Sequence, residues 1–243
     1  MVSFQTVKQS NAAVANLPKG LVALFIGATS AIGQSALEHF SQNASSPRIH
    51  SVARSQTASS HAGLLASLRQ SNPTGTYNLI TADVSLISEI DKVVNAVTQK
   101  ETKLDILIIR LAPGGLGAGG GDGGAAQRGR PGPARRGALV ALERVGALGH
   151  DGHAGAREAG ARTLFLATSD RYAVNGGLVP VPEGLEVAKK SDGGIFLVDP
   201  QGESTGDEEL LADFRARGVD EAVWSFTQKV FAAAQESKPK DEL

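Results

Sequence analysis

The chain has 243 residues, of which 41% are apolar and 20% are charged, and its formal net charge is −1. This length is sufficient for one sizeable domain with a buried core, or for two small domains. The near balance of 24 basic and 25 acidic residues gives no overall attraction to nucleic acid or to a membrane surface. Because the sequence contains no cysteine, disulfides and thiolate metal sites are excluded.

Two features of the termini bear on the location of the protein. The first twenty residues lack the apolar core of a secretory signal, and no apolar run in the sequence is long enough to cross a bilayer. The last four residues, Lys240-Asp241-Glu242-Leu243, spell a retrieval signal of the endoplasmic reticulum, but that signal acts only in the lumen. We therefore expect a cytoplasmic protein with no membrane partner and treat the tetrapeptide as a coincidence.

Residues 1–110 alternate apolar strands with amphipathic helices. The pattern predicts strands at 21–26, 49–53, 77–82 and 104–109 and helices at 31–42, 61–71 and 86–100. Repeated β-α-β units at such short spacing favour a parallel sheet with helices on both faces. The predicted fold class is therefore α/β, with a Rossmann-type parallel sheet.

Residues 111–155 form a segment of different composition. About half of the 29 glycines lie between Gly114 and Gly160, and no lysine occurs between Lys103 and Lys189. A segment rich in glycine, alanine and arginine buries too little apolar surface to offset the entropy lost on ordering its backbone. We expect it to be irregular, with His150 and His153 neither catalytic nor metal ligands. It has no aromatic side chain for base stacking, so we expect no nucleic-acid partner.

Residues 156–243 are interpreted as the C-terminal part of the same domain. The pattern predicts the end of a helix at 162–167, a strand at 194–198 and amphipathic helices at 210–217 and 221–234. Trp224, within the last helix, is expected to belong to the core. The sheet is expected to be incomplete in its C-terminal half.

The segment Gly27-Ala28-Thr29-Ser30-Ala31-Ile32-Gly33 joins the first predicted strand to the first predicted helix. A strand-to-helix turn of small residues lets a phosphate approach the backbone, and the free N–H groups of the helix start then face it. Gly27 suits the sharp turn, and Thr29 or Ser30 suits the helix cap. The segment is not a P-loop, because Gln34 stands where that motif has lysine. The alternative is a tight packing turn that binds no nucleotide.

Polar residues follow the next two predicted strands. Arg54-Ser55 comes after the second strand, where an arginine accommodates the 2′-phosphate of NADP and an acidic residue would hold the ribose of NAD. Asp83-Val84 comes after the third strand, where a carboxylate can accept a hydrogen bond from the adenine amino group. The alternatives are a solvated surface arginine at 54 and a helix-capping role for Asp83.

These motifs, together with Leu104-Asp105-Ile106-Leu107-Ile108, resemble the short-chain dehydrogenase/reductase family, in particular its fungal members of secondary-metabolite gene clusters. The resemblance covers about 1–109 and 157–235. It implies an NADP(H)-dependent enzyme that interconverts a carbonyl and an alcohol of a small-molecule substrate, commonly as a homo-oligomer. The implied cofactor-binding residues are Gly27, Thr29, Ser30, Ala31, Ile32, Gly33, Arg54, Ser55, Asp83 and Val84. Ala31 departs from the family's middle glycine.

Other departures concern catalysis. The family has an Asn-Asn-Ala-Gly-like sequence after its fourth strand, where this chain has Ile109-Arg110-Leu111-Ala112. It also has a Tyr-x3-Lys pair, in which the tyrosine is the general acid, whereas here Tyr77 and Tyr172 are followed four residues later by threonine and glycine. The catalytic residues are therefore unassigned. The alternative function is a non-catalytic nucleotide-binding remnant.

A shift of the reading frame in the gene is one explanation for the unusual composition of residues 111–155. If synonymous codons are chosen freely, translation of this segment one nucleotide further along can give a different amino-acid sequence. That sequence has the pattern of a strand with a serine, an acidic loop and a helix, as the family has. We hypothesise that 111–155 is out of frame and that sequence on both sides is deleted; the genomic codons test this. A third alternative, a structural or RNA-associated Gly/Arg protein, predicts RNA crosslinking that is lost when 111–155 is deleted.

Overall fold

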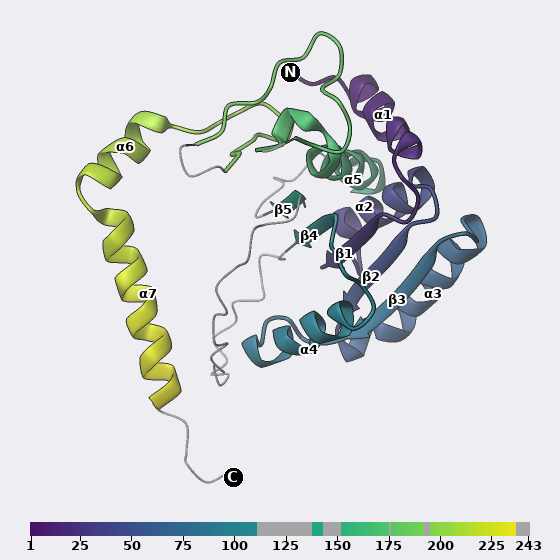
Figure 1. The fold of residues 1–243 in the computed structure, drawn as a ribbon, viewed down its shortest axis with the longest axis horizontal. Helices are drawn as coiled ribbons and strands as arrows, with labels where there is room; N and C mark the ends of the chain where they lie inside the picture. Colours follow the sequence, from purple (N-terminus) through teal and green to yellow (C-terminus); the bar gives the residue numbers. More distant parts are fainter. Residues whose placement is uncertain (111–137, 143–151, 175, 192–194, 237–243) are drawn as a thin grey trace.

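The structure, a computed structural model, describes residues 1–110, 138–142, 152–174, 176–191 and 195–236 (Figure 1). Five strands form its sheet: β1 (Val22–Ile26), β2 (Arg48–Ala53), β3 (Thr76–Thr81), β4 (Ile106–Arg110) and β5 (Ala138–Leu142). The α-helices are α1 (Phe4–Ala12), α2 (Ala31–Asn43), α3 (Ser55–Ser71), α4 (Ile87–Thr98), α5 (Gly152–Thr168), α6 (Glu208–Ala216) and α7 (Val219–Glu236), and there are two 3-10 turns, η1 (Ala13–Asn16) and η2 (Asp170–Tyr172).

The five strands are all parallel and lie in the order β3-β2-β1-β4-β5. The chain moves outward from β1 to β3 and then returns to the other side of β1 as β4. In the register, Phe25 lies opposite Ser51 of β2 and Ile108 of β4. This arrangement confirms the predicted Rossmann-type fold, and it creates a point between β1 and β4 where the strand order reverses.

Each face of the sheet has its own helices because the side chains of a strand alternate between the faces. Phe25 and Ile108 belong to the core on the side of α2, α3 and α5, where Phe40 of α2 packs with its ring centre 5.9 Å from that of Phe25. Leu24 faces the opposite side, where Val93 of α4 covers it. Figure 1 shows these layers around β1 to β3.

Most of the predicted elements are confirmed within a few residues. In the first 110 residues, α3 begins at Ser55 rather than at residue 61, and helix α1 was not predicted. The predicted strand at 194–198 is wrong. Val198 makes only an isolated antiparallel bridge with Ser204 in the described part of this segment, because the chain turns between them. Asp199 Oδ1 holds that turn by accepting hydrogen bonds from the N–H groups of Gln201 and Glu203, both at 2.9 Å.

The structure also corrects part of the expectation for residues 111–155. The apolar run 138–142 forms β5, with Ala138 opposite Ile106 of β4, and the first turn of α5 begins at Gly152. His153 lies in that turn, whereas His150 is outside the described residues. The division of the chain after residues 110 and 155 remains a prediction.

The two last helices differ from the rest in burial. Figure 1 shows α6 and α7 leading away from the sheet. Phe226 of α7 is 68% exposed and Trp224 is 47% exposed. The prediction that Trp224 belongs to the core is therefore wrong, because an amphipathic helix buries its apolar face only where another layer covers it. In the described ranges of the chain, no helix is long and apolar enough to cross a membrane.

Candidate functional site

The predicted binding residues meet at one edge of the sheet. Because β1 to β4 are parallel, the residues that follow them lie along the edge where the strands end, which we call the carboxyl edge. Gly27 follows β1, Arg54 follows β2, Asp83 lies two residues after β3, and Arg110 ends β4. In open parallel sheets, ligands bind in the crevice at this edge, at the point where the strand order reverses. Gly27 and Arg110 lie on the two strands that flank that point.

Two glycines shape the turn between β1 and α2. Gly27 has a φ of +81°, and a Cβ at this position would lie 2.1 Å from the carbonyl oxygen of Arg110. A Cβ at Gly33 would lie 2.1 Å from the carbonyl oxygen of Gly27. Only glycine fits at either position, so strand, turn and helix approach one another as closely as backbones can.

Ala31 occupies the middle position of the glycine motif and has a φ of +48°. It is exposed at the first residue of α2. Residues other than glycine enter this left-handed region at a cost of about 1–2 kcal/mol. The backbone therefore keeps the conformation that suits a glycine although the residue is an alanine.

The start of α2 has no side-chain cap. Ser30 is the N-cap residue as predicted, but its side chain accepts no hydrogen bond from the helix, and Thr29 and Ile32 are half-buried beside it. The N–H groups of a first helical turn have no partner within the helix, and the positive end of the helix dipole favours an anion there. An uncapped helix start behind a turn of small residues fits the pyrophosphate of a dinucleotide.

Arg54 and Asp83 lie close enough to interact electrostatically. Two hydrogen bonds from Ser85 to Asp83 Oδ1, from its hydroxyl at 2.7 Å and its N–H at 3.1 Å, lower the pKa of the Asp83 carboxyl, and the charge of Arg54 lowers it further. The side chain of Asp83 therefore holds the turn before α4, and the N-cap position of that helix is Leu86. Arg54 and Ser55 are exposed at the start of α3, and Val84 packs against the core beneath α4.

Neither tyrosine supplies an acid at the carboxyl edge. Tyr77 lies near the beginning of β3, at the opposite edge, and its hydroxyl contacts Ser41 Oγ at 2.7 Å. The hydroxyl of Tyr172 donates to the carbonyl oxygen of Gly202 at 2.7 Å, and burial raises its pKa. Both hydroxyl groups are therefore engaged in holding the fold.

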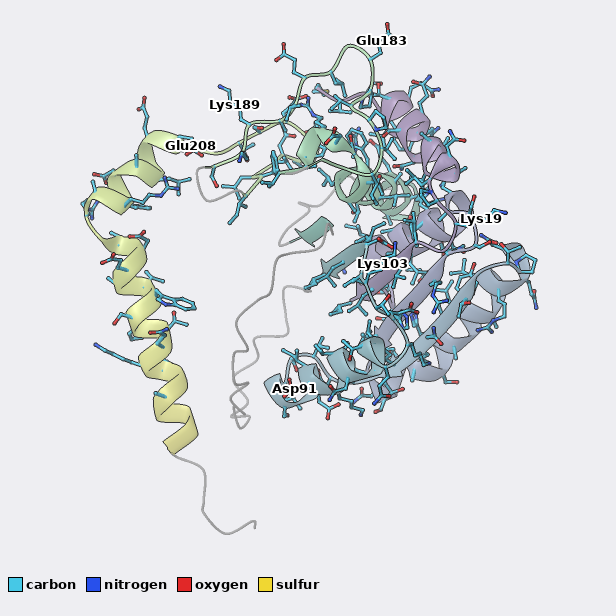
Figure 2. All side chains as sticks on the ribbon, in the orientation of Figure 1. Lys19, Asp91, Lys103, Glu183, Lys189 and Glu208 are labelled. Atoms are coloured by element: carbon cyan, nitrogen blue, oxygen red, sulfur yellow. The ribbon has the colours of Figure 1, made fainter. Side chains whose placement is uncertain are left out.

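No cluster that could bind a metal marks a different site on the described residues. Within them, no group of three or more His, Asp or Glu side chains could hold a metal ion. Charged side chains of both signs lie on the surface, for example Lys19, Asp91 on α4, Glu183 and Glu208 on α6 (Figure 2). The carboxyl edge is therefore the candidate site that the structure supports.

Comparison with known proteins found relatives among fungal oxidoreductases, and no protein-family profile matches the chain. The chain is 40% identical to the NmrA-like family domain-containing oxidoreductase notO of Aspergillus sp. (strain MF297-2), and the alignment covers 100% of both proteins. That alignment has 331 positions and this chain has 243 residues, so 88 positions have no counterpart here. The expectation that sequence is missing relative to the family is confirmed.

Two other relatives match only part of the chain. An oxidoreductase of Emericella nidulans is 39% identical over 120 residues, which are 49% of this chain and 34% of that protein. Oxidoreductase andH of Emericella variicolor is 33% identical over 109 residues, 45% of this chain and 32% of andH. The chain therefore spans about a third of the length of these two relatives.

Solved structures are also matched over part of the chain. L-sorbose reductase from Gluconobacter frateurii, complexed with NADPH and L-sorbose, is 26% identical over 37% of this chain and 32% of the reductase, with a TM-score of 0.33. A hydroxysteroid dehydrogenase from Escherichia coli is 19% identical over 42% of this chain and 38% of that protein, with a TM-score of 0.34. Because these likenesses are so partial, the fold is assigned from the order and direction of the strands alone.

Proposed function

This chain belongs to the short-chain dehydrogenase/reductase family, among its fungal oxidoreductases, and we propose that it binds NADP(H) to interconvert a carbonyl and an alcohol in fungal secondary metabolism. The observation that carries the proposal is the meeting of Gly27, Arg54 and Asp83 at the carboxyl edge, beside the point where the strand order reverses. We further propose a small-molecule substrate, a cytoplasmic location and assembly as a homo-oligomer, as the family resemblance implies.

The residues present fit the parts of a dinucleotide one by one. The uncapped start of α2 and the close approach of Gly27 and Gly33 suit the pyrophosphate. The exposed guanidinium of Arg54 suits the 2′-phosphate, and the ionised carboxylate of Asp83 suits the adenine amino group. A nicotinamide bound here supplies or accepts the hydride.

A cofactor test follows from the position of Arg54. In calorimetric titrations of the full chain, we expect NADPH to bind more tightly than NADH, by about 1.5–3 kcal/mol, the size of a hydrogen bond to a charged group. Arg54→Asp should abolish or reverse this preference. The matched control is Arg217→Asp, which changes the same charge at the C-cap of α6 and disturbs an exposed i,i+4 pair with Asp213 and a contact with the Phe214 ring. Equal affinities for the two cofactors, unchanged by Arg54→Asp, contradict the NADP assignment.

A second candidate function is a nucleotide-binding remnant without catalysis. It is favoured because the hydroxyl groups of Tyr77 and Tyr172 hold the fold and neither supplies an acid at the carboxyl edge. Since positioned proton transfer contributes about 10²–10⁴-fold to such a reaction, a chain without the acid should reduce carbonyl substrates near the background rate. NADPH consumption by the purified chain, by its Tyr172→Phe variant and by the product of the restored reading frame separates the two candidates. The reductase proposal expects activity of the restored product. Turnover by this chain that disappears in Tyr172→Phe shows that Tyr172 is an acid after all.

A further inference from the structure

We propose that Arg110 is a second phosphate-binding residue of this site, one that binds the pyrophosphate of the dinucleotide while Arg54 binds the 2′-phosphate. The inference rests on the proposed function and deepens it. It concerns a residue that departs from the family pattern, because β4 ends in an arginine where the family has an Asn-Asn-Ala-Gly-like sequence.

The register of β1 and β4 places Arg110 directly beside the turn. Ile26 lies opposite Ile109, so Gly27 and Arg110 are the next pair along the two strands. A Cβ at Gly27 would lie 2.1 Å from the carbonyl oxygen of Arg110 and 3.3 Å from its Cβ. The side chain of Arg110 therefore begins beside Gly27, next to the turn that leads into α2.

The alternation of side chains along β4 gives the direction in which Arg110 leaves the strand. Ile106 and Ile108 are buried in the core that Ala36 and Leu37 of α2 also line. Arg110 is two residues beyond Ile108 and therefore lies on that same face. This is the face on which α2 begins, so the guanidinium and the first turn of the helix lie on one side of the sheet.

The charge of Arg110 is not neutralised in the described part of the chain. Residues 1–110 contain four arginines. Arg48 forms an ion pair with Glu101 at 2.9 Å, and Arg69 donates to the carbonyl oxygen of Tyr77 at 2.9 Å. Among the described residues, the side chains of Arg54 and Arg110 have neither a hydrogen bond nor an ion pair, and these are the two arginines at the carboxyl edge.

A half-buried arginine beside the positive end of a helix is unfavourable unless an anion joins them. A guanidinium presents a planar fork of donors that matches a phosphate group. Arg54 and Arg110 lie on either side of β1, two strand spacings or about 10 Å apart. The turn between them takes the pyrophosphate, so Arg110 is placed for this group and Arg54 for the 2′-phosphate at the far side.

Three probes separate the roles of the two arginines: NADPH, NADH and adenosine 2′-monophosphate, which carries the 2′-phosphate but no pyrophosphate. Calorimetric titrations with the full chain should show that Arg110→Gln weakens NADPH and NADH alike, by about ten- to a hundredfold. The affinity of the Arg110→Gln variant for adenosine 2′-monophosphate should stay within twofold of the affinity of the unmodified chain. Arg54→Gln should weaken NADPH and adenosine 2′-monophosphate and leave NADH unchanged. Arg110→Lys should lie between the unmodified chain and Arg110→Gln.

Far-ultraviolet circular dichroism and the thermal midpoint establish that each variant is folded, and Arg217→Gln serves as the control for loss of a surface charge. If the Arg110→Gln variant binds both dinucleotides as tightly as the unmodified chain, the inference is overturned and the proposed function remains intact. A loss confined to NADPH and adenosine 2′-monophosphate also overturns it, because Arg110 would then bind the 2′-phosphate. If the unmodified chain binds neither dinucleotide, the proposed function fails, and the inference fails with it.

Discussion

The first 110 residues and the last two helices of this chain both carry the apolar patterns of regular secondary structure, but they differ in burial. Phe25 and Phe40 are fully buried between β1 and α2. Phe226 and Val223 of α7 are 68% and 59% exposed. Periodicity therefore predicts that a helix forms, but burial depends on whether the chain also supplies the layer that covers its apolar face.

The largest expected effect is on stability, and it compares two phenylalanines. Phe25→Ala should lower the free energy of unfolding by about 3–5 kcal/mol, because it removes a fully buried ring and leaves a cavity. Phe226→Ala should change it by less than about 0.5 kcal/mol, the usual range for exposed positions. Urea denaturation followed by circular dichroism measures both. A loss above about 1 kcal/mol in Phe226→Ala contradicts the comparison and shows that α7 is covered in solution.

The contrast explains how far the fold could be predicted from the sequence. Strands β1 to β4 are short apolar runs bounded by turn residues, and their helices carry apolar residues at helical spacing, so local patterns were sufficient. The burial of Trp224 could not be predicted in this way, because it depends on a partner layer that α7 itself does not specify. Strand β5 was missed because its apolar run, 138–142, lies within a segment whose composition favours irregular structure.

An intermediate effect is expected at the opposite edge of the sheet, where a carboxylate joins β2 to the loop after α4. Glu101 pairs with Arg48 Nε and with His50 Nε2, each at 2.9 Å. Burial raises the pKa of the Glu101 carboxyl, but the hydrogen bonds from Arg48 and His50 outweigh it and leave the pKa below its ordinary value of 4.5. Glu101→Gln should cost about 1–3 kcal/mol at neutral pH because it removes hydrogen bonds to a charged group.

The pH dependence of this contribution has a definite sign. Because the folded pKa of Glu101 is depressed, its stabilisation is present above pH 4.5 and is lost as the pH falls through the folded value. As the pH falls below 4.5, the free energy of unfolding of the unmodified chain should therefore decrease more steeply than that of the Glu101→Gln variant. Glu89→Gln, in an exposed i,i+3 pair with Lys92, is the control and should change stability by at most about 1 kcal/mol. Equal pH slopes for the unmodified chain and Glu101→Gln contradict the assignment.

The shared location of the candidate binding residues could be predicted from the sequence for a physical reason, whereas no catalytic residue could be assigned. The carboxyl ends of parallel strands share one edge, so a strand-by-strand reading of the sequence already brings Gly27, Arg54 and Asp83 together. The position of Arg110 beside Gly27 needed the strand register, in which Ile26 and Ile109 are the last pair before them. The left-handed conformation of Ala31 has no signal in the sequence other than its place in the glycine motif.

The smallest expected effect is on this alanine, and the chain offers a matched control. Ala31 and Ser46 are the two described residues other than glycine with positive φ, at +48° and +50°. Ala31 lies at the carboxyl edge, whereas Ser46 lies before β2, at the opposite edge. Replacing either by glycine removes the steric cost of the left-handed conformation but adds chain entropy to the unfolded state. Each substitution should therefore stabilise the fold by about 0.5–1 kcal/mol.

Cofactor affinity should distinguish these two variants. Ala31→Gly removes a methyl group from the turn that would face the pyrophosphate, so NADPH should bind severalfold more tightly, whereas Ser46→Gly should leave the affinity unchanged. Thermal unfolding and calorimetric titration of both variants measure the two effects separately. If Ala31→Gly lowers the thermal midpoint, the left-handed conformation of residue 31 is wrong. If both variants change NADPH affinity equally, the gain is a general effect of stability, and the methyl group of Ala31 does not limit access to the turn.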